Sequence, residues 1–271
     1  MADYDLAILG GGPGGYVAAI RGAQLGLKTC IIEKDKLGGI CLNWGCIPTK
    51  ALLKNAEVYN TIKNADKYGI KVDKISVDFP ANIKRSRNVS NRLSKGIEFL
   101  MKKNRISHIS GTGKLTSNTT LEVKNGKMTE IIEAHKIIIA TGARPRSFPG
   151  MEIDGKRVIS SKEAMVLDSP PKKMIIIGSG AIGSEFAYYY NEFGTEVHLV
   201  EMMDRILPVE DLDVSREVEK SFKNSGIKMS LGTKVSQIDS LKTKVKVHTE
   251  KDDKKEILEG DVALLAVGVT G

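Results

Sequence analysis

Residues 4–15 read YDLAILGGGPGG, a short apolar run that passes directly into a cluster of glycines. The run is typical of a buried β-strand, and Gly10, Gly12 and Gly15 have the spacing of a turn that opens a helix. In such a turn the first glycine makes the bend and the second lets backbone N–H groups approach a diphosphate. The third lets the helix lie close to the strand. The stretch therefore predicts a nucleotide-binding strand–turn–helix unit.

The residues that follow complete this unit. A small-residue helix is expected over about residues 14–25, and a second strand over residues 28–32. That strand ends in Glu33, which lies 23 residues after Gly10. A carboxylate at this place accepts hydrogen bonds from ribose hydroxyls, so Glu33 is predicted to bind the nucleotide's ribose.

The same pattern returns much later in the chain, where KMIIIG at residues 173–178 leads into a second glycine turn. A helix to about Phe193 and a strand at residues 196–200 follow, closed by Glu201, again 23 residues after the first glycine. One such motif is a weak signal, but two copies in the same register strongly predict two dinucleotide sites. The glycines of the second turn are Gly178, Gly180 and Gly183.

The repeat predicts the fold class and the domains. We expect an α/β chain with two Rossmann-like three-layer domains, one over residues 1–149 for the first nucleotide and one over residues 150–271 for the second. Long helical periodicity is present at about residues 49–68 and 81–104. Shorter strands are expected after it, near residues 106–110, 120–123 and 135–140.

Two further residues bear on the nucleotides. The apolar run HKIIIATG ends in the small turn of Thr141 and Gly142, where a ligand can approach the backbone. In the second copy, Glu201 would repel a 2′-phosphate, and the nearest arginine, Arg205, is four positions further on. The second site is therefore predicted to take NAD in preference to NADP.

Composition excludes several functional classes. The chain has 271 residues and a net charge of +8, and its basic residues are interleaved with acids, which is typical of solvated faces. A weak attraction for acidic partner domains is the alternative. Aromatic residues are only 5%, so nucleic-acid binding is not expected. The apolar runs are too short for a membrane span of about 20 residues. The start, MADYDLAILG, has no leader pattern, so we expect a cytoplasmic protein.

A pair of cysteines forms the second motif, in GGICLNWGCIPTK at residues 38–50. Three cysteines in a chain of this length exclude a secreted disulfide scaffold, so the close pair is catalytic or, less well supported by its spacing, metal-binding. Cys46 lies where a helix is expected to begin, and helix N-termini lower thiol pKa values to about 3.5–7.5. Cys41, on the preceding loop, is the better candidate to exchange with an outside disulfide. The neighbouring glycines allow the two sulfurs to meet, so we predict a redox pair.

The extended segment GGICLNWGCIPTKALL resembles the active-site segment of the flavoprotein disulfide reductases and, among them, the dihydrolipoamide dehydrogenase branch. Trp44, where valine is commoner, and Thr49, where serine is commoner, depart from the pattern. The resemblance extends through all 271 residues. The match to the lipoamide branch is carried by Leu42, Asn43, Ile47, Pro48, Lys50, Ala51, Leu52 and Leu53.

The resemblance implies a role for each motif. FAD would occupy the first glycine turn, with Thr141, Gly142 and Lys50 near it, and NAD would occupy the second. Glu185 matches the family's acid that pairs with the lysine beside the flavin. Reduced lipoamide would attack the disulfide through Cys41, and electrons would pass from Cys46 to the flavin and then to NAD. The implied partners are lipoyl-bearing domains of a 2-oxo acid dehydrogenase complex and, for the complete enzyme, a second subunit.

Complete family members continue beyond the length of this chain. The resemblance therefore implies an N-terminal portion, without the FAD domain's return segment, the C-terminal interface domain or the general base. We expect such a portion, alone, to bind FAD weakly and to turn over dihydrolipoamide poorly or not at all. Two alternatives stay open: a truncated FAD- and NAD-binding fragment without catalysis, and a reductase for another disulfide or a metal ion. Cys30 is expected to be a buried strand cysteine, and the four histidines are expected to be packing or surface residues.

Overall fold

The structure is a computed structural model that describes residues 2–271, and the chain divides into two compact units. The first unit holds the described residues up to Pro48, together with Ser86–Ala143 and Gly271. The second unit holds Thr49–Arg85 and Arg144–Thr270. Segment Thr49–Arg85 therefore packs with the second half of the chain, which a single division at residue 149 does not describe. Which domain binds which cofactor stays a prediction.

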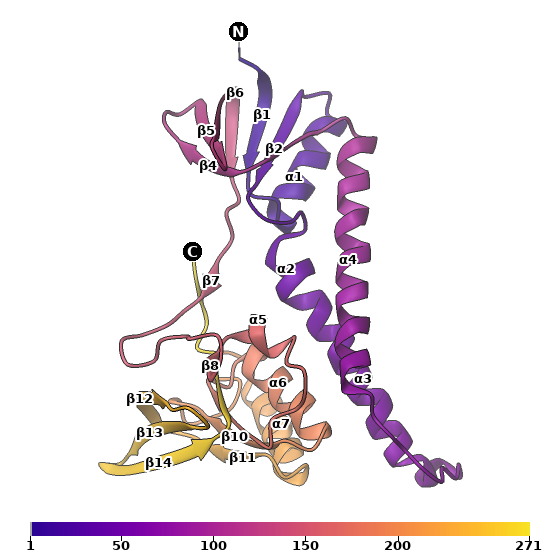
Figure 1. Ribbon diagram of the computed structural model, residues 1–271, viewed down its shortest axis with the longest axis vertical. Coiled ribbons are helices and arrows are strands. Elements are labelled where there is room, and N and C mark those ends of the chain that lie inside the picture. Colours follow the sequence, from indigo (N-terminus) through magenta and orange to yellow (C-terminus); the bar gives the residue numbers. More distant parts are fainter. Residues whose placement is uncertain (1) are drawn as a thin grey trace. The chain divides into compact units, whose positions relative to one another are not determined.

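The first unit is built on a six-stranded sheet in the order β3-β2-β1-β6-β5-β4 (Figure 1). Strands β3, β2, β1 and β6 are parallel neighbours, and β6, β5 and β4 form an antiparallel meander. The strands are β1 (Tyr4–Leu9), β2 (Thr29–Glu33), β3 (Ser107–Ser110), β4 (Thr112–Leu115), β5 (Thr120–Asn125) and β6 (Met128–Ile139). The helices that begin in this unit or end in it are α1 (Pro13–Gln24), α2 (Gly39–Trp44), α3 (Cys46–Lys63) and α4 (Phe79–Lys103).

Alternation along β1 explains the layers of this unit. Leu6 and Ile8 point to one face, where they pack with residues of α1 and α4 such as Ala19 and Ile97. Ala7 points to the other face and packs against the meander. Burying one large aliphatic side chain contributes about 1.5–3 kcal/mol, so both faces stabilise the sheet. Helices, parallel sheet and meander are the three layers.

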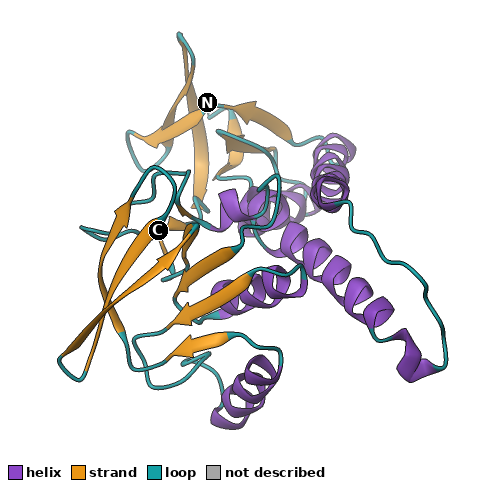
Figure 2. Cartoon of the chain, turned by 60° about the horizontal axis from the view of Figure 1, so that its bottom comes forward, coloured by secondary structure: helices purple, strands orange, loops and turns teal. Residues whose placement is uncertain are grey.

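The second unit repeats this plan. Its parallel sheet has the order β11-β10-β9-β15-β8, and a separate antiparallel sheet has the order β12-β13-β14. Figure 2 shows these strands in orange and the helices in purple. The strands are β7 (Arg144–Pro145), β8 (Val158–Ile159), β9 (Lys173–Ile177), β10 (Glu196–Val200), β11 (Lys228–Ser230), β12 (Lys234–Ser240), β13 (Val245–Lys251), β14 (Lys254–Gly260), β15 (Val262–Leu265) and β16 (Val269–Thr270). The helices are η1 (Ala65–Tyr68), α5 (Ser161–Ala164), α6 (Ala181–Glu192) and α7 (Leu212–Asn224).

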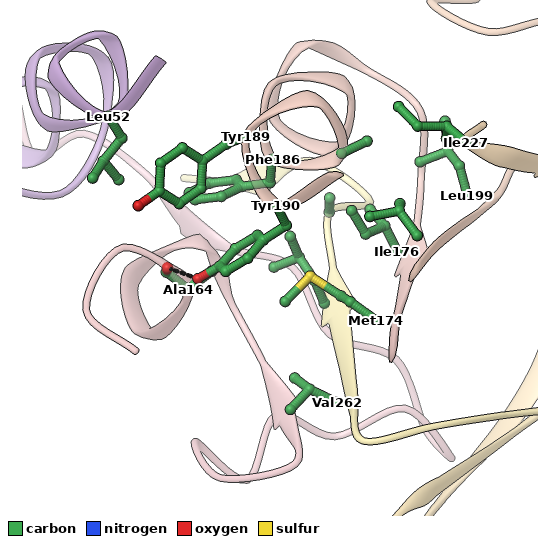
Figure 3. Packing of buried hydrophobic residues seen from close by; sticks show 14 of the residues in the cluster. Leu52, Ala164, Met174, Ile176, Phe186, Tyr189, Tyr190, Leu199, Ile227 and Val262 are labelled. Atoms are coloured by element: carbon green, nitrogen blue, oxygen red, sulfur yellow. Dashed lines mark hydrogen bonds between the residues drawn. The ribbon is translucent and has the colours of Figure 1, made fainter. Parts of the chain in front are cut away.

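The core of the second unit lies between β9 and the helices (Figure 3). Met174 and Ile176 of β9 pack against Phe186 and Tyr190 of α6, and the Tyr190 hydroxyl donates a hydrogen bond to the Ala164 carbonyl. Leu52 of α3 belongs to the same cluster, which explains why Thr49–Arg85 packs with this unit. The opposite face of β9 packs against the antiparallel sheet.

These features confirm the predicted fold class of two Rossmann-like three-layer domains. The predicted strand at residues 135–140 is longer than expected, because β6 also forms the last strand of the meander. Among the described residues, each helix is too short or too polar to cross a lipid bilayer.

Candidate functional site

The first glycine turn is closed by direct backbone contact. Gly10 has φ +109°, and a Cβ there would lie 2.2 Å from the Ala140 carbonyl oxygen. A Cβ on Gly15 would lie 1.8 Å from the Gly10 carbonyl oxygen. Both distances are far below a van der Waals contact, so only glycine fits at either position. We call this turn with the N-terminus of α1 the first cradle.

The second glycine turn, which with the N-terminus of α6 forms the second cradle, has the same construction. A Cβ on Gly178 would lie 2.5 Å from the Ala266 carbonyl oxygen, and one on Gly183 would lie 1.9 Å from the Gly178 carbonyl oxygen. The backbone of the two copies therefore agrees at each of these contacts.

Both cradles have the properties that a diphosphate requires. Gly12 and Gly180 precede α1 and α6 in extended conformation, and neither helix has a side-chain cap or an acid in its first turn. The first N–H groups of each helix are therefore not satisfied by a side chain, and the positive end of the helix favours an anion. Apart from its chain neighbours, no described residue has an atom within 4 Å of the place a Cβ would take on Gly180. The residues present fit the diphosphate of a dinucleotide.

Glu33 lies beside the first cradle, as its position at the end of β2 predicts. Its Oε2 accepts a hydrogen bond from the N–H of Gly11 at 2.7 Å, and its Oε1 accepts one from the N–H of Asp35 at 2.9 Å. A carboxylate has about four acceptor positions, so Glu33 keeps capacity for ribose hydroxyls.

Glu201 repeats this arrangement at the second cradle. Its Oε2 accepts hydrogen bonds from the N–H and the hydroxyl of Ser179 at 2.8 and 2.9 Å, and its Oε1 accepts one from the N–H of Met203 at 2.9 Å. Glu201 is buried. Arg205 donates instead to the Pro208 carbonyl at 2.9 Å, within its own loop.

The two cysteines of the redox segment (residues 38–50) are joined in a disulfide. The Cα atoms of Cys41 and Cys46 lie 4.7 Å apart, within the usual range for this bond. Cys46 begins helix α3, as predicted. The expectation that Cys41 lies on a loop is wrong, because it lies in the short helix α2, which starts after Gly38 at φ +96°.

The start of the redox segment packs on the first cradle. The Gly38 N–H donates to the Gly11 carbonyl at 2.8 Å. A Cβ on Gly39, whose φ is +57°, would lie only 2.6 Å from the Gly12 Cα. The start of the segment with the disulfide is therefore held directly against the backbone of the first cradle.

Helix α4 supplies residues that the sequence analysis missed. Three serines spaced four apart donate from its buried face to the redox segment: Ser86 to the Pro48 carbonyl at 3.0 Å, Ser90 to that of Leu42 at 2.5 Å, and Ser94 to the Asn43 side chain at 2.9 Å. The spacing of four places them on one helix face and was visible in the sequence. In the structure all three serines are buried, and a buried hydroxyl needs a hydrogen-bond partner of this kind.

Arg87 adds a fourth contact from the same helix. Its Nη1 donates to the Asn43 carbonyl at 2.7 Å, and its guanidinium carbon lies 4.8 Å from the centre of the Trp44 ring. Burial lowers the pKa of Arg87 from its ordinary value.

Lys50 and Glu185 form an ion pair in the second unit. Lys50 lies one turn after Cys46 on α3, and Glu185 lies in the second turn of α6. The side chain of Lys50 is 63% exposed and that of Glu185 is 26% exposed. Two residues far apart in the sequence are thus brought together.

Three further residues of the sequence analysis, Thr141, Gly142 and Cys30, lie outside the glycine turns and the redox segment. Thr141 and Gly142 follow β6 directly after Ala140, which contacts Gly10, and Gly142 has φ +72°. Cys30 lies fully buried in β2, and burial chiefly raises its pKa to about 12, so its thiol is not activated. Within residues 2–271, no group of three or more His, Cys, Asp or Glu side chains has an arrangement that could hold a metal ion.

Known proteins resemble this chain over its full length. Dihydrolipoyl dehydrogenase from Chlorobaculum tepidum is 44% identical over 273 residues, covering 100% of this chain and 58% of that protein. Dihydrolipoyl dehydrogenase from Bacillus subtilis is 43% identical, covering 98% of this chain and 58% of that protein. This chain therefore spans about 58% of the length of these curated relatives.

Solved structures show the same fold. LpdA from Mycobacterium tuberculosis superposes with a TM-score of 0.89 at 29% identity, covering 97% of this chain and 58% of that one. The copper(II) complex of RclA, an HOCl-induced flavoprotein disulfide reductase from Escherichia coli, gives 0.85 at 28% identity, covering 99% and 57%. The family model of the pyridine nucleotide-disulphide oxidoreductases matches residues 4–271. With its two cradles and its cysteine pair, the chain belongs to this family.

Proposed function

We propose that this chain is the cofactor-binding part of an oxidoreductase that oxidises dihydrolipoamide to lipoamide and reduces NAD+. The observation that carries the proposal is the Cys41–Cys46 disulfide in a segment that packs on the first cradle, with a Gly39 Cβ only 2.6 Å from the Gly12 Cα. The choice of dihydrolipoamide is supported by the similarity to curated dihydrolipoyl dehydrogenases.

Two cofactors fit the two cradles. We assign FAD to residues 1–149 and NAD to residues 150–271. FAD, when bound, would carry two electrons between the cysteine pair and the nicotinamide. The FAD-binding residues are Gly10, Gly12, Gly15, Glu33, Lys50, Thr141 and Gly142. The NAD-binding residues are Gly178, Gly180, Gly183 and Glu201.

The cysteine pair performs the thiol chemistry. A thiolate of the substrate attacks Sγ of Cys41, the bond between the two cysteines breaks, and Cys46 leaves as a thiolate. The second substrate thiol then displaces Cys41, so the substrate becomes a disulfide and the protein gains the electron pair. Because Cys46 begins α3, the positive end of that helix stabilises its thiolate. Lys50, held by Glu185, is assigned to the flavin side of the same helix turn.

The proposal includes partners and place. We assign the chain to a homodimeric enzyme of the cytoplasm that serves lipoyl-bearing domains of a 2-oxo acid dehydrogenase complex. A second candidate is a reductase for another disulfide or for a metal ion, and the structural similarity to RclA favours it. A nucleotide-binding fragment without turnover is the third.

The test uses the chain reconstituted with excess FAD. Dihydrolipoamide should produce the long-wavelength absorbance of a thiolate beside oxidised flavin, and Cys46→Ser should abolish it. Cys30→Ala is the matched control, because Cys30 is buried outside the redox segment, and it should keep the band. If dithiothreitol produces the band and dihydrolipoamide does not, another dithiol is the substrate. A band that survives in Cys46→Ser contradicts the assignment of the thiolate.

A further inference from the structure

The contacts between α4 and the redox segment concentrate on the end of α2. This short helix ends at Trp44, so its last carbonyl groups have no partner within the helix. Ser90 donates to the carbonyl of Leu42, and Arg87 donates to that of Asn43. Both acceptors lie between the two cysteines in the sequence, within the ring that the disulfide closes.

Arg87 is held in an unusual way. One of its nitrogens donates to the Asn43 carbonyl, whereas Nε and Nη2 are buried and have no hydrogen-bond partner among residues 2–271. Leaving buried polar groups unpaired is costly. The contacts that hold the guanidinium in this place are those with the Asn43 carbonyl and the Trp44 ring. A planar cation over an indole ring contributes favourably when it is partly desolvated. Together the two contacts fix the turn that connects Cys41 to Cys46.

We propose that Arg87 is a positioning residue that keeps the thiols of Cys41 and Cys46 within closing distance after the disulfide is reduced. This inference rests on the proposed function of these cysteines as the redox pair. In the reduced state only the backbone through Gly45 joins α2 to the start of α3, and the contacts of Arg87 do not depend on the S–S bond. Loss of Arg87 would let the turn relax and would lower the effective concentration of one thiol at the other.

The test is an equilibrium with dithiothreitol. One dithiothreitol molecule gives two electrons and two protons to the disulfide, whose S–S bond breaks to give two thiols, while dithiothreitol closes to its cyclic disulfide. The fraction of reduced protein is measured by alkylation and intact mass at a series of dithiothreitol ratios. Arg87→Ala should shift this equilibrium about fivefold toward the reduced form, since it loses a charge-assisted hydrogen bond and a cation–π contact.

Three further variants make the result decisive. Arg92→Ala removes an exposed arginine from the same helix and should leave the equilibrium within about twofold of the parent chain. Arg87→Lys keeps the charge but not the planar fork, so it should give a partial shift. In a double-mutant cycle with Trp44→Leu, the two effects should be less than additive, because the residues touch each other. A merely structural role would change thermal stability in both redox states without this coupling.

Several outcomes would overturn the inference. An Arg87→Ala equilibrium equal to that of Arg92→Ala shows that the contact does not position the thiols. A shift toward the disulfide shows instead that the charge of Arg87 acts on the thiolate. If dihydrolipoamide proves not to be the substrate, the dithiothreitol equilibrium still reports on Arg87. A disulfide that dithiothreitol does not reduce in the parent chain contradicts both this inference and the proposed function.

Discussion

The two halves of the chain share a frame and differ in one connection. In both, a first strand turns through glycines into a helix, a glutamate lies at the end of the second strand or directly after it, and a third parallel strand follows. From β10 to β11 the connection contains one helix, α7. From β2 to β3 it contains α2, α3, η1 and α4, and the redox segment lies at its start.

The shared frame and the long connection of the first half have different roles. The shared frame is what a dinucleotide needs, because both halves have a glycine turn at a helix N-terminus and a glutamate that accepts hydrogen bonds beside it. The long connection of the first half adds the cysteine pair and the helix face that holds it. The cysteine pair therefore lies in a crossover connection, whose length can change without changing the register of the sheet.

The largest effect should come from the cradles themselves. Gly15→Ala and Gly183→Ala should each destabilise their unit by more than about 4 kcal/mol, since each Cβ would overlap a carbonyl oxygen at 1.8 or 1.9 Å. Denaturant unfolding measures the loss. Gly96→Ala is the control, because this exposed helix position has open space and should gain about 0.5–1 kcal/mol. Equal behaviour of the three variants would contradict a closed cradle.

A second prediction separates the cradles by nucleotide. Glu201→Gln removes the charge that opposes a 2′-phosphate and should raise the affinity for NADP relative to NAD by about tenfold, which is about 1.4 kcal/mol. Titration of both nucleotides measures the ratio. Glu196→Gln, at the exposed start of the same strand, should leave the ratio unchanged. An unchanged ratio in Glu201→Gln would show that this carboxylate does not select the nucleotide.

A third prediction concerns how each helix packs on its sheet. Gly22 of α1 and Tyr190 of α6 are equivalent, because each follows the third glycine of its cradle by the same number of residues. The Tyr190 hydroxyl donates a hydrogen bond to the Ala164 carbonyl. Tyr190→Phe should cost about 1–2 kcal/mol, because it leaves that carbonyl unpaired. The buried hydroxyl of its neighbour Tyr189 has no hydrogen-bond partner in the described part of the chain, so Tyr189→Phe should stabilise the chain by up to about 1 kcal/mol. Thermal unfolding of both variants distinguishes them, and the same sign for both contradicts the prediction.

The smallest effect on stability should come from the Lys50–Glu185 pair. The residue of α1 that is equivalent to Glu185, counted from the third glycine of the cradle, is the exposed Val17. The acid is therefore specific to the second copy. Glu185→Gln should change the free energy of unfolding by less than about 1 kcal/mol, because Lys50 is mostly exposed. Glu219→Gln is a matched control, since its partner is Lys223 and the glutamate is 25% exposed against 26% for Glu185. Of the two variants, only Glu185→Gln should slow the reduction of bound flavin by a dithiol. If both variants are reduced at the same rate, Glu185 has no role at the flavin.

Much of this frame was predictable, because its signals are local. Glycine spacing, apolar runs and the acid at a fixed distance each reflect contacts within one strand–helix–strand unit. The short helix containing Cys41 was not predicted, since six residues with two flanking glycines have little helical signal of their own. Its carbonyl groups are satisfied by α4, more than forty residues later in the chain. A helix that depends on a partner so distant in the sequence cannot be predicted from the residue pattern around it.

The contact between Gly12 and Gly39 has a consequence for protein engineering. In the first half a Cβ on Gly39 would overlap the Gly12 Cα at 2.6 Å, so the redox segment can pack against the cradle only with glycine at position 39. In the second half the corresponding space beside Gly180 is open. A cysteine-bearing loop placed between Glu201 and Leu212, with its own glycine facing Gly180, would therefore find room beside that glycine, and a second cysteine pair could be built into the same chain.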